Sequence, residues 1–187
     1  MRSLYETKFD IRVDQNFSSA DSLFARFSYD QANSDVPGGA AGFFAAANAF
    51  GRNQGRNVPL GETHVFSTAS VNQFSFGYNR IFNYVTSQGT GTCEAAKIGI
   101  PGANLGCVNG TTCASSSCGL TSTNITGGGY WSLGDRGCSP FQSGTNIFTI
   151  NDTFEMIRGK HDIKVGGGIR INQMNVEPKG SRTDFGL

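Results

Sequence analysis

The cysteines are the first residues of this chain to weigh for chemistry, because a thiolate can bind a metal, attack a substrate or form a disulfide. All five lie in one stretch, residues 86–144, and they are Cys93, Cys107, Cys113, Cys118 and Cys138. No two of them have the C-x-x-C spacing of a zinc site, and the two histidines, His64 and His161, fall in expected strands far from that stretch. We therefore expect no metal site.

Disulfides are the favoured state of these thiols. A long segment without a core of its own gains stability from cross-links, and disulfides persist in an oxidising compartment. Cys113 with Cys118 and Cys93 with Cys107 are plausible pairs, which leaves Cys138 without a partner. Spacing alone does not fix the connectivity, so other pairings stay open.

Catalytic motifs are missing from the sequence, which contains no G-x-S-x-G, P-loop or H-E-x-x-H pattern. The carboxylates Asp10 and Asp14 are spaced closely enough to suggest acid-base chemistry, but basic residues surround them, and ion pairing on a strand face is the simpler interpretation. A run of three glycines, Gly166 to Gly168, resembles a phosphate-binding loop. The run falls inside an expected strand, however, where glycines mark a bend or a close backbone approach. We expect no enzyme activity and no cofactor.

The elements that would position these groups are β-strands, and the clearest pair spans residues 145–176. A type II′ turn favours glycine at its first central position, where Gly159 falls if Arg158 pairs with His161. Counting outward with a period of two places large apolar side chains on one face, with two opposite pairs: Phe154 with Val165, and Met156 with Ile163. The other face carries charged residues, among them Glu155, Lys164 and Arg170.

A second hairpin with the same alternation spans about residues 5–31. If its turn centres on Ala20, Asp14 lies opposite Arg26 on the polar face. Opposite charges in that position would stabilise the pairing of the two strands by a small amount.

A third hairpin spans about residues 61–85, and its register is open. Val65 and Phe66 are adjacent, so only one of them can face the apolar side of a regular strand. A β-bulge, which adds one residue to one strand, would let both side chains be accommodated.

The composition excludes several classes of protein. The chain has 187 residues, of which 37% are hydrophobic, and a formal net charge of +1. Such a balance of charges argues against a nucleic-acid partner. No apolar run approaches the ~18 residues that a membrane-spanning helix needs.

The connections between the hairpins differ in kind from the turns within them. The turns are short, whereas residues 32–60 and 86–144 are long segments rich in Gly, Asn, Ser and Ala. Short turns at one end and long loops at the other are typical of outer-membrane barrels, whose turns are periplasmic and whose loops are extracellular. We therefore predict an all-β fold, an antiparallel up-and-down meander of about six long strands in three hairpins, forming a segment of a transmembrane β-barrel.

In such a barrel the apolar face meets lipid and the polar face lines the lumen. The residues expected to face lipid are Phe154, Met156, Ile163 and Val165. The residues expected to face the lumen or a plug are Asp14, Arg26, Glu155, Lys164 and Arg170. Asp152 conflicts with this assignment, because the same register places it on the apolar face, where a carboxylate would cost up to ~2 kcal/mol near the bilayer midplane. Either a bulge turns it inward or the register is different.

Five segments of the chain resemble, in family order, the barrel domain of TonB-dependent receptors: RVDQNFSSADSLFARFSYD, ETHVFSTASVNQFSFGYNRI, IGIPGANLG, SLGDRGCSPF and IRGKHDIKVGGGIR. The resemblance covers about Lys8 to Arg182 and is nearest to the Oar-like group, whose members carry a carboxypeptidase-regulatory-like domain ahead of the plug. It implies an outer-membrane transporter that takes up a large or scarce nutrient with energy passed from the inner membrane by TonB.

The sequence also departs from that family. It shows no TonB box, plug domain or regulatory-like domain, and six strands cannot close a barrel of the ~22 strands that such transporters have. We therefore expect an internal fragment of a larger receptor. Its partners would be outer-membrane lipid, the rest of its own barrel and plug, an unknown nutrient, and TonB only through absent segments. No ligand-contact residue carries over from the family.

The alternative function is that of a secreted or surface-exposed β-sheet binding protein, similar to an adhesin, with a disulfide-pinned loop. A soluble β-sandwich has the same alternation of apolar and polar residues. Such a protein would purify without detergent, whereas a barrel segment would aggregate through its open edges.

Overall fold

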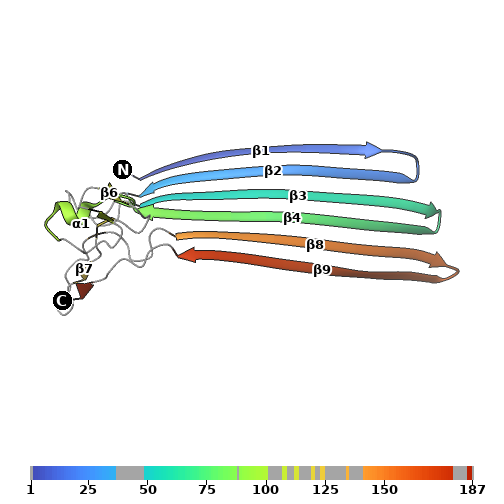
Figure 1. Cartoon of the computed structure of the whole chain (residues 1–187). Coiled ribbons are helices and arrows are strands. Elements are labelled where there is room, and N and C mark those ends of the chain that lie inside the picture. Colours follow the sequence, from blue (N-terminus) through green and yellow to red (C-terminus); the bar gives the residue numbers. More distant parts are fainter. Residues whose placement is uncertain are drawn as a thin grey trace.

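Six long strands form one antiparallel sheet in the order β1-β2-β3-β4-β8-β9 (Figure 1). The computed structural model describes residues 2–36, 49–87, 89–100, 107–108, 112–113, 119–120, 123–124, 134, 141–178 and 185–186. The long strands are β1 (Ser3–Asn16), β2 (Asp21–Val36), β3 (Ala49–Ser67), β4 (Ser70–Ser87), β8 (Phe141–Arg158) and β9 (His161–Pro178). The predicted meander of three hairpins is confirmed. The sheet is open, with β1 and β9 at its two edges.

The remaining elements are short and lie at the end of the sheet away from the hairpin turns (Figure 1). They are the helix α1 (Glu94–Lys97) and the strands β5 (Cys107–Val108), β6 (Thr112–Cys113), β7 (Thr123–Asn124) and β10 (Phe185–Gly186). β5 pairs with β6 in antiparallel fashion, and β10 pairs with β7 in parallel. Within the described residues, no helix is both long enough and apolar enough to cross a bilayer.

The hairpin β8–β9 has the register that the sequence predicts. Arg158 is opposite His161, and the turn between them contains Gly159 with a φ of 65°. This left-handed conformation costs a glycine little, which explains why the turn forms at this position. Outward from the turn, Met156 lies opposite Ile163, Phe154 opposite Val165 and Glu155 opposite Lys164.

The predicted register of the hairpin β1–β2 is wrong by two residues. Asp14 lies opposite Phe24, and Arg26 lies opposite Arg12. The turn centres on Ser19 instead of Ala20, because the Ser18 hydroxyl accepts hydrogen bonds from the amides of Ala20 and Asp21. A shift of two residues leaves every side chain on the face expected for it, since side chains alternate with period two.

The strands extend further than the expected loop boundaries. β2 continues to Val36 and β3 begins at Ala49, so much of the segment expected as a loop, residues 32–60, is strand. At the other loop, β4 continues to Ser87 and β8 begins at Phe141. Residues 49–60 are rich in Gly, Asn and Arg, which suggested a loop. They pair with β2 on one side and β4 on the other, and pairing on both sides outweighs weak strand propensity.

The predicted bulge in the hairpin β3–β4 is confirmed. The register shifts between Val65 and Ser67, so Phe66 is the extra residue. Its ring contacts the rings of His64 at 4.3 Å and Phe154 at 6.0 Å between centroids.

Several glycines of the sheet lie beneath large side chains of the neighbouring strand. A Cβ atom on Gly61 would overlap the ring of Phe24, and the guanidinium of Arg12 lies 4.9 Å from the centre of that ring. Gly166 and Gly168 are covered in the same way by Thr153 and Asn151. Close approach of the neighbouring strand therefore explains Gly166 and Gly168, two residues of the run that resembles a phosphate-binding loop.

We predict that Gly61→Ala destabilises the folded protein by about 1–3 kcal/mol, because the new methyl group must displace the Phe24 ring. The matched control is Gly77→Ala on the neighbouring strand, where the nearest atom to the new methyl is 3.9 Å away. Urea unfolding of the full-length protein in lipid vesicles measures both free energies. Equal unfolding free energies for the two variants would contradict this account of Gly61.

Candidate functional site

The register divides the side chains of the sheet between two faces of opposite character. Residues directly opposite each other on paired strands share a face, so one face can be followed from Val13 through Ala25, Leu60 and Phe76 to Ile150. We call the apolar zone of this face the apolar band. Its members are Phe9, Ile11, Val13, Leu23, Ala25, Phe27, Tyr29, Val58, Leu60, Phe74, Phe76, Tyr78, Phe148, Ile150, Phe154, Met156, Ile163, Val165, Ile169 and Ile171.

The apolar band is not covered by other parts of the described chain. Val165 and Ile169 are 65% and 64% exposed, and Ile11 is 58% exposed. In the part of the chain that the structure describes, the buried apolar residues are Cys93 and Ala95, both beside or in α1. An apolar surface of this extent marks an interface with lipid or with another protein.

The band ends in aromatic side chains on the side of the long loops. The rings of Phe9 and Tyr29 lie 5.4 Å apart, and those of Tyr78 and Phe148 lie 5.0 Å apart. Beyond this edge the same face carries polar side chains together with aromatic ones such as Phe82 and Tyr84. The Tyr29 hydroxyl donates to the side-chain oxygen of Gln31, as does the amide of Gln54, both at 2.7 Å.

The opposite face, which we call the polar face, is built from ion pairs and small residues. Along it, basic residues contact nearby carboxylates, in the pairs Lys8–Glu6 at 2.6 Å, Arg12–Asp14 at 2.6 Å, Arg26–Asp10 at 2.8 Å and Lys164–Glu155 at 3.2 Å. The Ser28 hydroxyl also binds Asp10. Near the long loops this face carries apolar residues as well, among them Ile81 and Met174.

The register gives a definite face to every residue expected to face lipid or the lumen. Phe154, Met156, Ile163 and Val165 lie in the apolar band, and Glu155, Lys164, Arg170, Asp14 and Arg26 lie on the polar face. The expected contact between Asp14 and Arg26 is wrong, because Asp14 binds Arg12 and Arg26 binds Asp10. Arg170 donates from Nε to the side chain of Asn172 at 3.3 Å. What each face contacts in the cell stays a prediction.

Asp152 lies on the same face as the apolar band, opposite Phe74 and Gly167, so no bulge turns it inward. Its carboxylate accepts a hydrogen bond from the Asn72 amide at 2.9 Å. A Cβ atom on Gly167 would meet nothing within 4 Å, which leaves open space beside Asp152. The Asn72 amide therefore gives this carboxylate a polar partner on the face of the apolar band.

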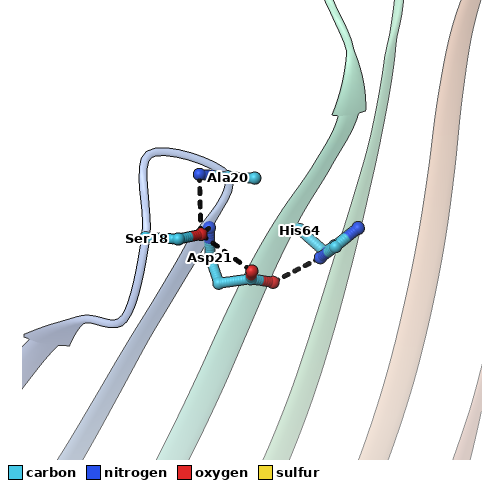
Figure 2. Close-up of polar contacts among 4 residues, drawn as sticks. All are labelled: Ser18, Ala20, Asp21 and His64. Carbon is cyan, nitrogen blue, oxygen red and sulfur yellow. Dashed lines mark hydrogen bonds and ion pairs between the residues drawn. The ribbon is translucent and has the colours of Figure 1, made fainter.

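A polar cluster at the turn end joins the first turn with β2 and β3 (Figure 2). Asp21 lies between Ser18 and His64: the Ser18 hydroxyl bonds one carboxylate oxygen at 2.9 Å, and the His64 Nδ1 contacts the other. A hydrolytic triad requires the imidazole to contact the serine, whereas here the carboxylate lies between them. With the Val65 amide donating to the Ala20 carbonyl at 2.8 Å, the cluster anchors the first turn to β3.

The structure describes only part of the cysteine-rich segment. Cys93 is 2% exposed and disulfide-bonded. The backbones of Cys107 and Cys113 lie opposite each other on β5 and β6. Cys118 and Cys138 lie outside the described residues. The pairing therefore stays a prediction. Among the described residues, no three or more His, Cys, Asp or Glu side chains gather as they would around a metal.

The sequence interpretation did not identify the β3 side chains that lie near the long loops on the same face as the apolar band. In residues 50–60, long side chains alternate with small ones: Phe50, Arg52, Gln54, Arg56, Val58 and Leu60 against Gly51, Asn53, Gly55, Asn57 and Pro59. This alternation in size has the period of a strand. It would have placed Arg52 and Arg56 on the face of the apolar band.

The comparisons with known proteins agree with this architecture. The family model described as "Outer membrane beta barrel domain" matches residues 2–186, nearly the whole chain. No curated protein and no solved structure matches the chain. The family match supports a location in the outer membrane. The chain belongs to the outer membrane beta barrel domain family.

Proposed function

We propose that this chain is part of the barrel of a TonB-dependent receptor of the Oar-like group, which takes up a large or scarce nutrient through the outer membrane. The observation that carries the proposal is the series of five segments that resemble such receptors in family order. The open six-stranded sheet fits a part of a large barrel, since even the smallest membrane barrels need about eight strands to close.

The apolar band meets lipid in this proposal, and the polar face lines the lumen. Ion pairs and small residues on the polar face suit a wide, hydrated or plugged lumen better than the tightly filled interior of a small barrel. Turns would lie on the periplasmic side and long connections outside the cell.

The length of the strands supports the same orientation. β3 has 19 residues and β4 has 18, whereas a strand needs only about 9–11 residues to cross a bilayer. The apolar band occupies the half nearer the turns, so the strands continue past it as an extension that carries both polar and apolar side chains. Such an extension would hold the extracellular loops, where a large nutrient would first bind, above the membrane.

We predict that cysteines introduced at neighbouring positions of β9 react with different probes in the full-length protein. Val165→Cys should react with a lipid-confined maleimide, because Val165 lies in the apolar band. Lys164→Cys is the matched control, because it lies on the polar face, and should react only with a water-soluble maleimide. Labelling is compared with the unsubstituted protein to subtract the native cysteines. Equal reaction of both sites with the lipid-confined probe would contradict the assignment of the faces.

We also predict that uptake depends on TonB while binding does not. Cells that lack the full-length protein should lose uptake of one member of a panel of metal chelates, oligosaccharides and peptides. Cells that lack TonB should still bind that compound at the surface but take up none above background. Binding without TonB-dependent uptake in the parent strain would instead favour a surface binding protein.

A further inference from the structure

Two arginines lie side by side at the loop-side edge of the apolar band. Arg56 on β3 and Arg80 on β4 are directly opposite each other, on the same face as the band. The next residues of that face toward the turns are Val58 and Tyr78, which belong to the band. The arginines therefore lie between the apolar band and a zone nearer the long loops, where polar residues share this face with Phe82 and Tyr84.

Within the described residues neither arginine forms an ion pair, although Glu177 lines a second hollow together with Arg80. Arg80 donates from Nη1 to the side-chain oxygen of Asn146 at 3.0 Å, and the Tyr78 hydroxyl donates to the same oxygen at 3.1 Å. None of the ion pairs of the described chain includes Arg56 or Arg80. Like charges directly opposite each other in a sheet repel, so an anion from outside the chain would stabilise the pair.

The basic residues of the polar face differ from this arginine pair in their partners. There, the basic residues Lys8, Arg12, Arg26 and Lys164 each contact a carboxylate of the same chain. These four charges are thus balanced internally, while Arg170 on the same face contacts the neutral side chain of Asn172. The arginine pair beside the apolar band is left to be balanced by its surroundings.

The pair also borders a hollow that can hold a ligand group. The hollow has a volume of about 260 Å³ and is lined by Gln54, Arg56, Tyr78, Arg80 and Phe82. Guanidinium groups present planar forks of N–H donors that match phosphate oxygens, and each such charge-assisted contact is stronger than a neutral one. Phosphate is therefore the anion that fits the arginine pair best.

We propose that Arg56 and Arg80 bind a phosphate group of an anionic lipid in the outer leaflet of the outer membrane. The inference rests on the outward orientation of the apolar band proposed above. The pair is continuous with that band and lies between Tyr78 on the turn side and Phe82 and Tyr84 on the loop side, and aromatic side chains of this kind gather at the level of lipid headgroups. A soluble phosphate compound on its way through the barrel would meet the polar face instead.

The test uses the full-length protein in phosphatidylcholine nanodiscs that contain a small fraction of lipid A, and native mass spectrometry measures the lipid A bound. The variant Arg56→Gln/Arg80→Gln should lose about tenfold or more in apparent affinity, since each contact to a charged group is lost. Arg56→Lys/Arg80→Lys, which keeps the charge without the fork, should lie between this variant and the parent. The matched control Arg170→Gln removes a charge from the polar face and should bind as the parent does.

Two further arms distinguish the source of the phosphate. Lipid A without its phosphates should bind the parent as weakly as intact lipid A binds the double variant. Inorganic pyrophosphate, which has no acyl chains, should not displace lipid A. Equal binding of both lipids, unchanged binding by the double variant, or displacement by pyrophosphate would each overturn the proposal. If cysteine labelling at Val165 succeeds and lipid A binding is unchanged in the double variant, the lipid site fails while the orientation of the barrel stands.

Discussion

The ladder of backbone hydrogen bonds between neighbouring strands is the constraint on which the rest of this structure depends. Within a bilayer no water is available to the backbone, so each amide and carbonyl of a spanning strand must pair with the next strand. That pairing fixes the register, and the register assigns each side chain to one of two faces. The apolar band, the ion pairs of the polar face and the arginine pair at the edge of the band all follow from it.

The sequence predicts most where a turn is chemically specific. Gly159 fixes the hairpin β8–β9 completely, because few residues other than glycine accept its backbone conformation. At the hairpin β1–β2, the hydrogen bonds of Ser18 move the turn by one residue, which alternation alone could not reveal. The face of each side chain was still predictable, because an error of two residues in the register keeps every side chain on the same face. The arginine pair was not predictable, because the composition of residues 49–60 suggested a loop where β3 lies.

A protein of this kind is not stabilised by a core. Within the described chain the buried apolar residues belong to the neighbourhood of α1, and the strands have none. Large apolar side chains instead point outward from a single layer of strands, while Phe24, Thr153 and Asn151 lie over glycines on the polar face. Stability must come from the ladder, from these local contacts and from the surroundings of the apolar band.

The positions of the three turns have a consequence for how such a sheet can close. Along the row that joins Val13, Leu60 and Ile150, the distance to the turn grows from hairpin to hairpin: the strands end at Asn16, Ser67 and Arg158. Each hairpin is therefore shifted along the strand direction relative to the previous hairpin, so the sheet is staggered. Strands displaced in this way are inclined to the barrel axis, and neighbours in the ladder sit at different depths in the membrane. Residues that lie at the same depth in the membrane consequently belong to different rows of paired residues. No single row of directly paired residues marks one depth around the barrel.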